Sequence, residues 1–278
     1  MDYSIFITVP LHVRATAEKE VSMGLSKTKH YSDIGWLLER PIAHRGYHSG
    51  DGRCPENSLA AFEAAIKKRF PIELDVRLLK DGNAVVFHDA NAKRMTGIDA
   101  AIGELVLSDL KYITLLGSQA CIPLLEEALD LINGRVPALV EIKNTGMPGK
   151  LEKRVAQVLS AYLGRVAVQS FNPHSLRWFN IQLPSIPRGQ VAGIMDDLDL
   201  PVFERFFIKN LLLNRISMPQ FIPYECKNLP SFPASLARKR GIPILAWTVT
   251  TREEQKKVIP FCDNVIFEGF NPDVDVNQ

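Results

Sequence analysis

Residues 41–89 read PIAHRGYHSGDGRCPENSLAAFEAAIKKRFPIELDVRLLKDGNAVVFHD. Short apolar runs, of the length of buried strands, lie on both sides of an amphipathic helical pattern over residues 58–68. Asn57 is the expected N-cap of that helix, because a short polar side chain there can accept a hydrogen bond from the first turn. Strands that alternate with helices in this way favour βα units and a parallel sheet.

The same alternation continues along the rest of the chain. The strand candidates are residues 41–44, 72–78, 84–88, 138–142, 166–170, 190–194, 211–216, 244–249 and 264–268. The helix candidates are residues 58–68, 124–133, 150–163, 173–179, 200–210, 230–239 and 252–260. The pattern predicts an α/β fold, a (β/α)8 TIM barrel. Because there are nine strand candidates, we expect one strand outside the ring and some distortion of the barrel.

One connection does not follow the βα rhythm. Only residues 79–83, which include Asp81-Gly82, separate the second strand from the third. A parallel crossover needs a dozen or more residues, whereas Asp-Gly is a favoured hairpin turn. We therefore predict an antiparallel hairpin that brings His88 back beside Glu73 and Asp75.

Two segments stand apart from this repeating pattern. Residues 91–122 contain no convincing βα unit, and we interpret them as a small insertion over the barrel mouth, after the third strand. Residues 1–32 have no clear periodicity and are interpreted as an appended N-terminal segment. The barrel domain is then expected to span residues 33–278.

Carboxylates occur inside two of the apolar runs. Glu73 and Asp75 are two residues apart in a strand, so their side chains leave the same face. Carboxylates that point into a barrel are costly unless a cation offsets their charge. Two interpretations are open at this point: metal ligation, or a buried salt bridge with Arg77 or Arg45.

Glu141 and Lys143 repeat this spacing at the end of another predicted strand. The C-terminal ends of barrel strands are where such enzymes build their active sites. The alternative for this pair is an internal ion pair between the two side chains. If Glu141 joins Glu73 and Asp75, three hard oxygen ligands suit Mg²⁺, Ca²⁺ or Mn²⁺ better than zinc.

His44 and His88 each end an apolar run and are followed by a charged residue. A histidine has a pKa near 6.5 when unperturbed, so a pair of them can supply a general base and a general acid at neutral pH. Two histidines that converge on a carboxylate cluster point to catalysis. The sequence does not distinguish the acid from the base.

The ordered motifs HRG, PEN-S, ELD, DG, FHD, EIK, SF and WTV extend over residues 40–272 and resemble the glycerophosphodiester phosphodiesterase family. The resemblance implies that Arg45 contacts the phosphate and that Glu56 lies at the substrate pocket. It also implies that Phe171 and Trp247 are walls of a glycerol pocket. From the residues alone, Glu56 could equally serve the dipole of the following helix, and both aromatic residues could be core residues.

The last strand departs from the family pattern. Many members have an aspartate in a T-D-x-P sequence near this point, whereas the chain has Phe267-Glu268-Gly-Phe-Asn-Pro272. Glu268 is the candidate substitute for that aspartate.

The expected function is metal-dependent hydrolysis of glycerophosphodiesters to glycerol 3-phosphate and an alcohol, with Arg45 and Lys143 offsetting phosphate charge. Family members are thought to use the glycerol hydroxyl as the first nucleophile, through a cyclic phosphate. A second hypothesis keeps this chemistry for lysophospholipid or sphingolipid diesters and needs an apolar entrance. Its candidate residues are Ile98, Ile102, Leu105 and Val106. A third, a catalytically idle barrel that acts as a binding module, would predict a missing ligand or histidine, and none is missing.

Composition excludes several other classes of protein. The formal net charge is only +2, and the short basic clusters at 67–69 and 238–240 fall at predicted helix ends, so no nucleic acid partner is expected. Four cysteines without a CxxC pair are typical of reduced thiols in a cytoplasmic enzyme. No apolar run has the length of a membrane helix, and no basic region precedes the first apolar stretch as in a secretory signal.

Overall fold

The computed structural model describes residues 34–49, 52–193 and 202–273. The segment predicted over residues 1–32 therefore lies outside the described residues, as do Ile194 at the end of one expected strand and the first residues of the helix expected over 200–210.

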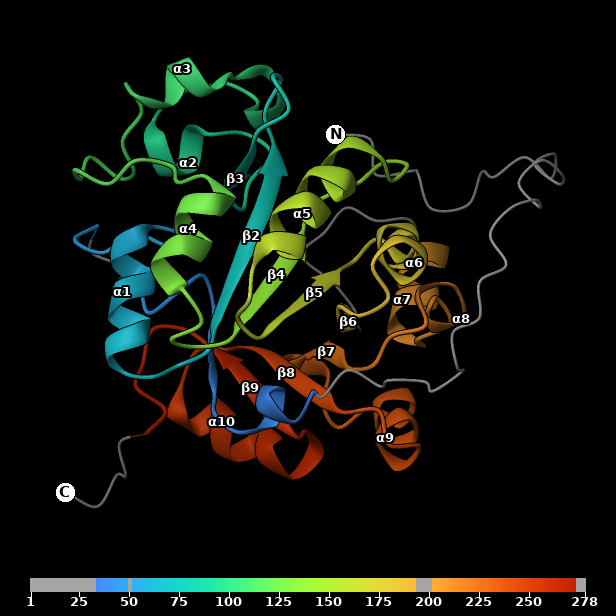
Figure 1. Cartoon of the computed structure of the whole chain (residues 1–278). Coiled ribbons are helices and arrows are strands. Elements are labelled where there is room, and N and C mark those ends of the chain that lie inside the picture. The colour runs from blue at the N-terminus through green and yellow to red at the C-terminus, as the bar shows by residue number, and fades with distance from the viewer. Residues whose placement is uncertain (1–33, 50–51, 194–201, 274–278) are drawn as a thin grey trace, which may run out of the picture.

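A parallel barrel organises the chain (Figure 1). The strands follow the hydrogen-bonded order β6-β5-β4-β2-β1-β9-β8-β7, with β3 paired outside this path. Their bounds are β1 Ile42–Ala43, β2 Ile72–Leu78, β3 Ala84–Val86, β4 Ala138–Ile142, β5 Val166–Ser170, β6 Arg188–Gln190, β7 Ile222–Glu225, β8 Ile244–Val249 and β9 Asn264–Phe267. Parallel bridges from Gly189 to Phe221 and from Ala192 to Tyr224 join the two ends of the path, so the ring is nearly closed. The predicted TIM barrel is confirmed.

Helices cover the outside of the ring (Figure 1). Their bounds are α1 Leu59–Lys67, α2 Lys93–Thr96, α3 Leu107–Leu110, α4 Leu125–Ile132, α5 Lys150–Ala161, α6 Pro173–Gln182, α7 Val202–Lys209, α8 Asn214–Ser217, α9 Phe232–Lys239 and α10 Arg252–Val258. The N-cap of α1 is Ser58, whose hydroxyl accepts a hydrogen bond from the Ala61 amide at 3.2 Å, and not Asn57 as predicted. The Asn57 side chain instead forms a hydrogen bond with Asp75.

One strand was predicted in the wrong place. Residues 211–216 form a turn and the start of α8, and the seventh strand is β7, Ile222–Glu225. The apolar run at 211–216 has no period that separates a strand from a helix, and Pro223 argues against the true strand because it lacks an amide hydrogen.

The predicted hairpin is confirmed. Strands β2 and β3 are antiparallel, with Val76 opposite Val86 and Leu78 opposite Ala84. The Gly82 amide donates to the Leu79 carbonyl oxygen at 3.0 Å, and Gly82 has a φ of +88°. The chain therefore returns toward Asp75, whose carbonyl oxygen accepts a hydrogen bond from the Phe87 amide at 2.9 Å. His88 follows at the mouth of the barrel.

Gly82→Val should destabilise the protein by about 1–2 kcal/mol, the usual cost of a left-handed backbone for a residue with a Cβ. The cost is conformational, because a Cβ at this position meets no atom within 4 Å. Denaturant unfolding measures it. Gly82→Asn is the matched control and should lose less stability, since asparagine tolerates positive φ. Equal losses for Val and Asn would show that backbone conformation is not the cause.

The insertion between β3 and α4 has its own small core. It contains α2, a 3₁₀ turn at Ile102–Glu104 and α3. Residues from it pack against β3 and its flanks in one cluster: Leu79, Val85, Phe87, Ala92, Met95, Ile102, Leu110, Ile113, Leu115 and Ile122. Ile102 is buried and Leu105 packs against the cluster, so these two residues build the insertion and do not offer an apolar entrance.

The barrel interior is layered. Toward the N-terminal ends of the strands it is filled by apolar side chains, among them Trp36, Leu139 and Phe221. Side chains alternate along a strand, so Leu139, Glu141 and Lys143 all face inward, at successive heights. Above the apolar layer the interior therefore becomes acidic and then basic at the rim.

Candidate active site

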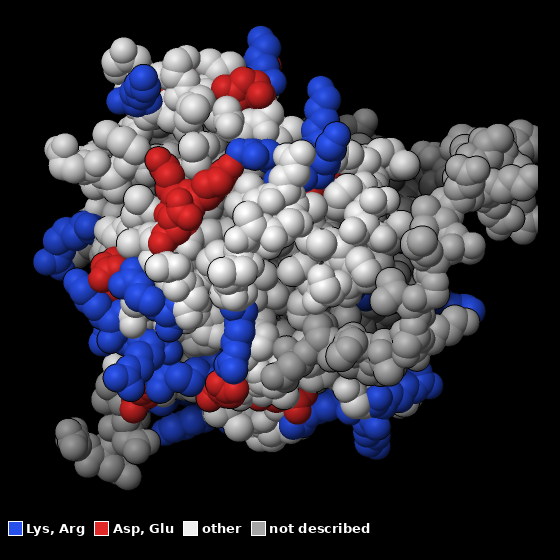
Figure 2. Space-filling model, viewed as in Figure 1, with Lys and Arg blue, Asp and Glu red and all other residues white. Residues whose placement is uncertain are grey.

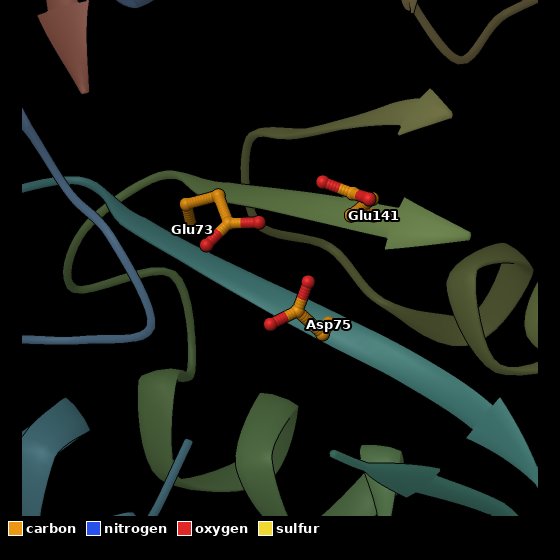
Figure 3. Close-up of side chains that lie close together, drawn as sticks. All are labelled: Glu73, Asp75 and Glu141. Atoms are coloured by element: carbon orange, nitrogen blue, oxygen red, sulfur yellow. The ribbon is translucent and has the colours of Figure 1, made fainter. Parts of the chain in front are cut away.

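Three carboxylates meet inside the barrel, as predicted. Glu73 and Asp75 come from β2 and Glu141 from β4, and the register places Asp75 beside Glu141 (Figure 3). One oxygen atom from each of the three lies within 4.8 Å of the others, and all three residues are buried. Among the described residues this is the one group of acidic, histidine and cysteine side chains that could hold a metal ion.

Two cations from the barrel rim contact this cluster. The Lys143 ammonium lies 3.0 Å from Asp75 Oδ1 and 2.5 Å from Glu141 Oε1. Arg45 Nε lies 3.3 Å from Asp75 Oδ2. The ion pairs that the sequence suggested between Lys143 and Glu141 and between Arg45 and Asp75 are therefore present. Arg77, the other candidate partner, instead donates to the His88 carbonyl oxygen at 2.7 Å.

The electrostatics of the cluster favour a further cation. Burial, followed by the charges of Asp75 and Glu141, raises the pKa of Glu73 well above its usual value. Burial acts in the same direction on Asp75, but Lys143, His88 and Arg45 outweigh it and lower the pKa of that carboxyl. A buried carboxylate that is held with raised pKa beside two others is relieved when a divalent ion binds them. Asp75 Oδ1 and Glu141 Oε1 share one described partner, the Lys143 ammonium, so a single positive charge serves two buried carboxylates there. The donor set fits a hard divalent cation.

Two amide side chains hold the carboxylates in place. Gln169 Nε2 on β5 lies 3.1 Å from Glu141 Oε2 and 3.4 Å from Glu73 Oε1. Asn57 Nδ2 donates to Asp75 Oδ2 at 2.8 Å. Sequence reasoning missed both roles. Gln169 does face inward by strand alternation, so its position in β5 was the available signal.

His44 is oriented by Glu268. Its Nδ1 lies 2.6 Å from Glu268 Oε2, and its Nε2 lies 4.0 Å from Glu73 Oε2. The hydrogen bonds to His44 and His48 lower the pKa of Glu268, so this carboxylate is charged and accepts the Nδ1 proton. Burial lowers the pKa of His44, against the effect of Glu268. The ring is therefore neutral near pH 7, with an unprotonated Nε2 directed toward the carboxylates.

His88 is oriented in a similar way by its neighbour. Its Nδ1 lies 2.7 Å from Asp89 Oδ1, and Arg94 Nε donates to the other oxygen of Asp89 at 2.6 Å. Burial would raise the pKa of Asp89, but His88 and Arg94 lower it, so the carboxylate is ionised. His88 is the more exposed of the two histidines, with 32% of its side chain exposed against 13% for His44.

Glu56 connects Arg45 at the barrel rim to Arg94 in the insertion. It accepts hydrogen bonds from Arg45 Nη1 at 2.7 Å and from Arg94 Nη2 at 2.6 Å. Arg94 belongs to α2 of the insertion, so this short helix is tied to the residues that orient both Arg45 and His88. From the sequence, Glu56 was expected to interact with the helix dipole or to lie at the substrate pocket. Its ion pair with Arg94, a residue 38 positions away, was not expected.

Arg45 reaches the cluster because the strand ends early. Strict alternation would direct it away from His44, but Arg45 has a φ of 53° and Gly46 a φ of +82°. The turn aims the Arg45 amide at Glu73 Oε2, 3.0 Å away. A Cβ on Gly46 would lie 2.9 Å from the Ala61 backbone, so α1 approaches too closely for another residue.

The rings of Phe171 and Trp247 contact each other at the barrel mouth. Their ring centroids are 5.7 Å apart in an edge-to-face arrangement, and Phe171 lies 6.0 Å from the Lys143 ammonium. Trp247 is half-buried, and its indole nitrogen has no hydrogen-bond partner among the described residues. The two rings make an apolar wall beside the carboxylates.

Residues 44–267 match the model of the glycerophosphoryl diester phosphodiesterase family. The chain belongs to this family. The resemblance seen in its ordered motifs is confirmed, and with it the enzyme class, a phosphoric diester hydrolase.

Individual relatives agree with the family assignment. A glycerophosphodiester phosphodiesterase of Caldanaerobacter subterraneus is 28% identical over 232 residues, which are 78% of this chain and 88% of the relative. The crystal structure of a glycerophosphodiester phosphodiesterase from Thermotoga maritima is 26% identical with a TM-score of 0.63, covering 82% of this chain and 94% of that one. A phosphodiesterase of Oleispira antarctica, solved in complex with sn-glycerol 3-phosphate, has the same fold with a TM-score of 0.69 at 24% identity, over 84% of this chain and 93% of that chain.

Charged side chains are unevenly distributed on the surface. On the face shown in Figure 2, acidic side chains gather in one patch left of centre and basic side chains gather mainly toward the lower left, with uncharged surface beside them. Within the described part of the chain, no helix is long and apolar enough to cross a membrane.

Proposed function

We propose that the protein hydrolyses glycerophosphodiesters to glycerol 3-phosphate and an alcohol, with a divalent cation held by Glu73, Asp75 and Glu141. The observation that carries the proposal is the meeting of three buried carboxylates with two histidines, each fixed by a carboxylate, at one end of a barrel. The complex of the Oleispira antarctica structure with sn-glycerol 3-phosphate supports the proposed product.

The cation, Mg²⁺, Ca²⁺ or Mn²⁺, would polarise the phosphoryl oxygens and lower the pKa of a hydroxyl group next to it. Arg45 and Lys143 bring positive charge to the same place, where it offsets the charge that develops on the phosphate in the transition state. The planar guanidinium of Arg45 suits two phosphate oxygens at once.

We assign the general base to His44 and the general acid to His88. His44 is buried beside Glu73, and its Nε2 takes the proton of the glycerol hydroxyl as that oxygen bonds to phosphorus. His88 lies off the ring on the side of the insertion, more open to a departing group, and its Nε2 gives a proton to the alcohol oxygen as the ester bond breaks. Water then opens the resulting cyclic phosphate to glycerol 3-phosphate. Phe171 and Trp247 pack against the glycerol carbons.

Lysophospholipid and sphingolipid diesters are the alternative substrates to be tested. The human lysophospholipase D GDPD1 is 36% identical over 144 residues, but these are only 45% of this chain and 42% of that protein. Of the four candidates for an apolar entrance, Ile102 and Leu105 are used in the core of the insertion, which leaves only Ile98 and Val106. We therefore favour diesters without an acyl chain. Turnover of glycerophosphocholine should exceed that of lysophosphatidylcholine in parallel assays of choline release. A preference for the lysophospholipid would favour the alternative.

Glu268→Ala should lower kcat roughly 10- to 1000-fold with little change in KM, because Glu268 fixes the His44 tautomer and touches no proposed phosphate ligand. Glu268→Gln keeps an acceptor for the Nδ1 proton and should retain more activity than the alanine variant. Steady-state kinetics on glycerophosphocholine makes the comparison. A rise in KM at constant kcat would instead place Glu268 in substrate binding.

A further inference from the structure

A hollow lies at the barrel rim on the side of the insertion. It has a volume of about 490 Å³, within the usual range for a small-molecule site. Its apolar lining comes from Leu78, Ile102 and Leu151. Lys143, which contacts Asp75 and Glu141, also lines this hollow, so it begins one side chain away from the proposed metal ligands.

The charged residues that line the hollow are all basic. Arg77, Lys143 and Lys150 all line it, and none of its described lining residues is acidic. Lys150 is the first residue of α5, where a cation opposes the helix dipole. Lys150 is exposed, so its charge is available at the mouth of the hollow.

Both walls of the hollow are fixed by hydrogen bonds. On the α5 side, Asn144 donates to Glu152 Oε1 at 2.6 Å, and Asn172 donates to the carbonyl oxygens of Asn144 and Gly146 at 3.1 and 2.8 Å. On the insertion side, the Ile102 amide donates to the Ala90 carbonyl oxygen at 2.9 Å. A site with prearranged walls loses little ordering free energy when it binds a ligand.

The position of the hollow matches the departing half of the substrate. With the glycerol against Phe171, which directly follows β5, and Trp247 on β8, the phosphate lies at the carboxylates. The hollow is bounded instead by the rim of β2, the segment after β4 and the insertion. His88, whose carbonyl oxygen is held by Arg77, is on this side as well. In an in-line displacement the alcohol leaves opposite to the attacking hydroxyl, and so toward this hollow.

We propose that this hollow binds the alcohol portion of the diester and selects head groups that carry an anionic group, with Arg77 and Lys150 facing the anion. The inference rests on the proposed function and adds the class of head group to it. Head-group choice then depends on the insertion, which supplies one wall.

The test compares three glycerophosphodiesters whose head groups differ in charge: glycerophosphocholine, glycerophosphoinositol and glycerophosphoinositol 4-phosphate. We expect kcat/KM to rise in that order and the differences to shrink as salt is added. Lys150→Glu should lower kcat/KM for the 4-phosphate roughly three- to tenfold, as expected when one solvent-screened charge is reversed, and leave glycerophosphocholine unchanged or improved. Lys153→Glu, on the same helix but outside the lining of the hollow, is the matched control and should show no such change.

Equal kcat/KM for the three diesters, or the same ratio of kcat/KM between the 4-phosphate and glycerophosphocholine in Lys150→Glu as in the unaltered protein, would overturn the inference. Calorimetric measurement of inositol 4-phosphate binding distinguishes a failure of the inference about the hollow from a failure of the proposed function. If no diester is cleaved but this alcohol binds and the Lys150→Glu change weakens it, the hollow stands and the reaction is wrong. If binding is the same in both proteins, the hollow is not an anion site.

Discussion

Removal of divalent cations should reduce diester hydrolysis to the background rate, and added Mg²⁺, Ca²⁺ or Mn²⁺ should restore it. Glu73, Asp75 and Glu141 are buried together, and Lys143 and Arg45 reach only part of their oxygen atoms. A diester anion cannot approach this cluster at low cost until a cation offsets its charge. Assays of a chelated and dialysed sample, with each metal added back in turn, measure the effect.

The same cation should stabilise the fold. An ion that binds the native cluster and not the unfolded chain contributes about 2.7 kcal/mol when its concentration is 100 times its dissociation constant. Thermal unfolding with and without metal shows this in the unaltered protein. Asp75→Asn is the control, since it removes a ligand and should abolish the metal-dependent shift. Full turnover by a sample shown to contain no metal would contradict the assignment.

His44→Ala and His88→Ala should each lower kcat by a factor on the order of 10²–10⁴, the usual result of removing a general acid or base. Each imidazole is fixed through Nδ1 by a carboxylate, which leaves its Nε2 for proton transfer. Both variants should fold, because both side chains lie at the barrel mouth and outside the apolar clusters. Steady-state kinetics and circular dichroism together make this test.

A matched variant controls for the loss of any histidine. His174 lies on α6 and has no assigned role in the site, so His174→Ala should keep near-normal kcat. A near-normal kcat in either His44→Ala or His88→Ala would remove that histidine from the mechanism. A substrate whose alcohol is a good leaving group needs little help from an acid, so it should rescue His88→Ala more than His44→Ala.

Local patterns account for what the sequence predicted well. Residues two apart in a strand share a face, so the inward direction of Glu73, Asp75 and Glu141 follows from strand spacing alone. The Asp81-Gly82 turn lies in a connection too short for a crossover, so the hairpin that places His88 follows from turn chemistry and length. Both features depend on residues close together in the chain.

Long-range partners account for what the sequence could not predict. Glu268 and His44 are 224 residues apart and meet only because β1 and β9 are neighbours in the closed ring. Arg94 reaches Glu56 only through the shape of the insertion, which has no repeating pattern to read. The misplaced strand at 211–216 has a different cause: a short apolar run fits a strand or a buried helix equally well.

The most direct test of the central claim is phosphorus NMR of glycerophosphocholine incubated with the protein and Mg²⁺. We predict that the diester signal is replaced by that of glycerol 3-phosphate, that chelator stops the conversion, and that Glu141→Gln does not perform it. Conversion to glycerol 3-phosphate at an unchanged rate by Glu141→Gln or in the presence of chelator would contradict a metal-dependent site built on these three carboxylates.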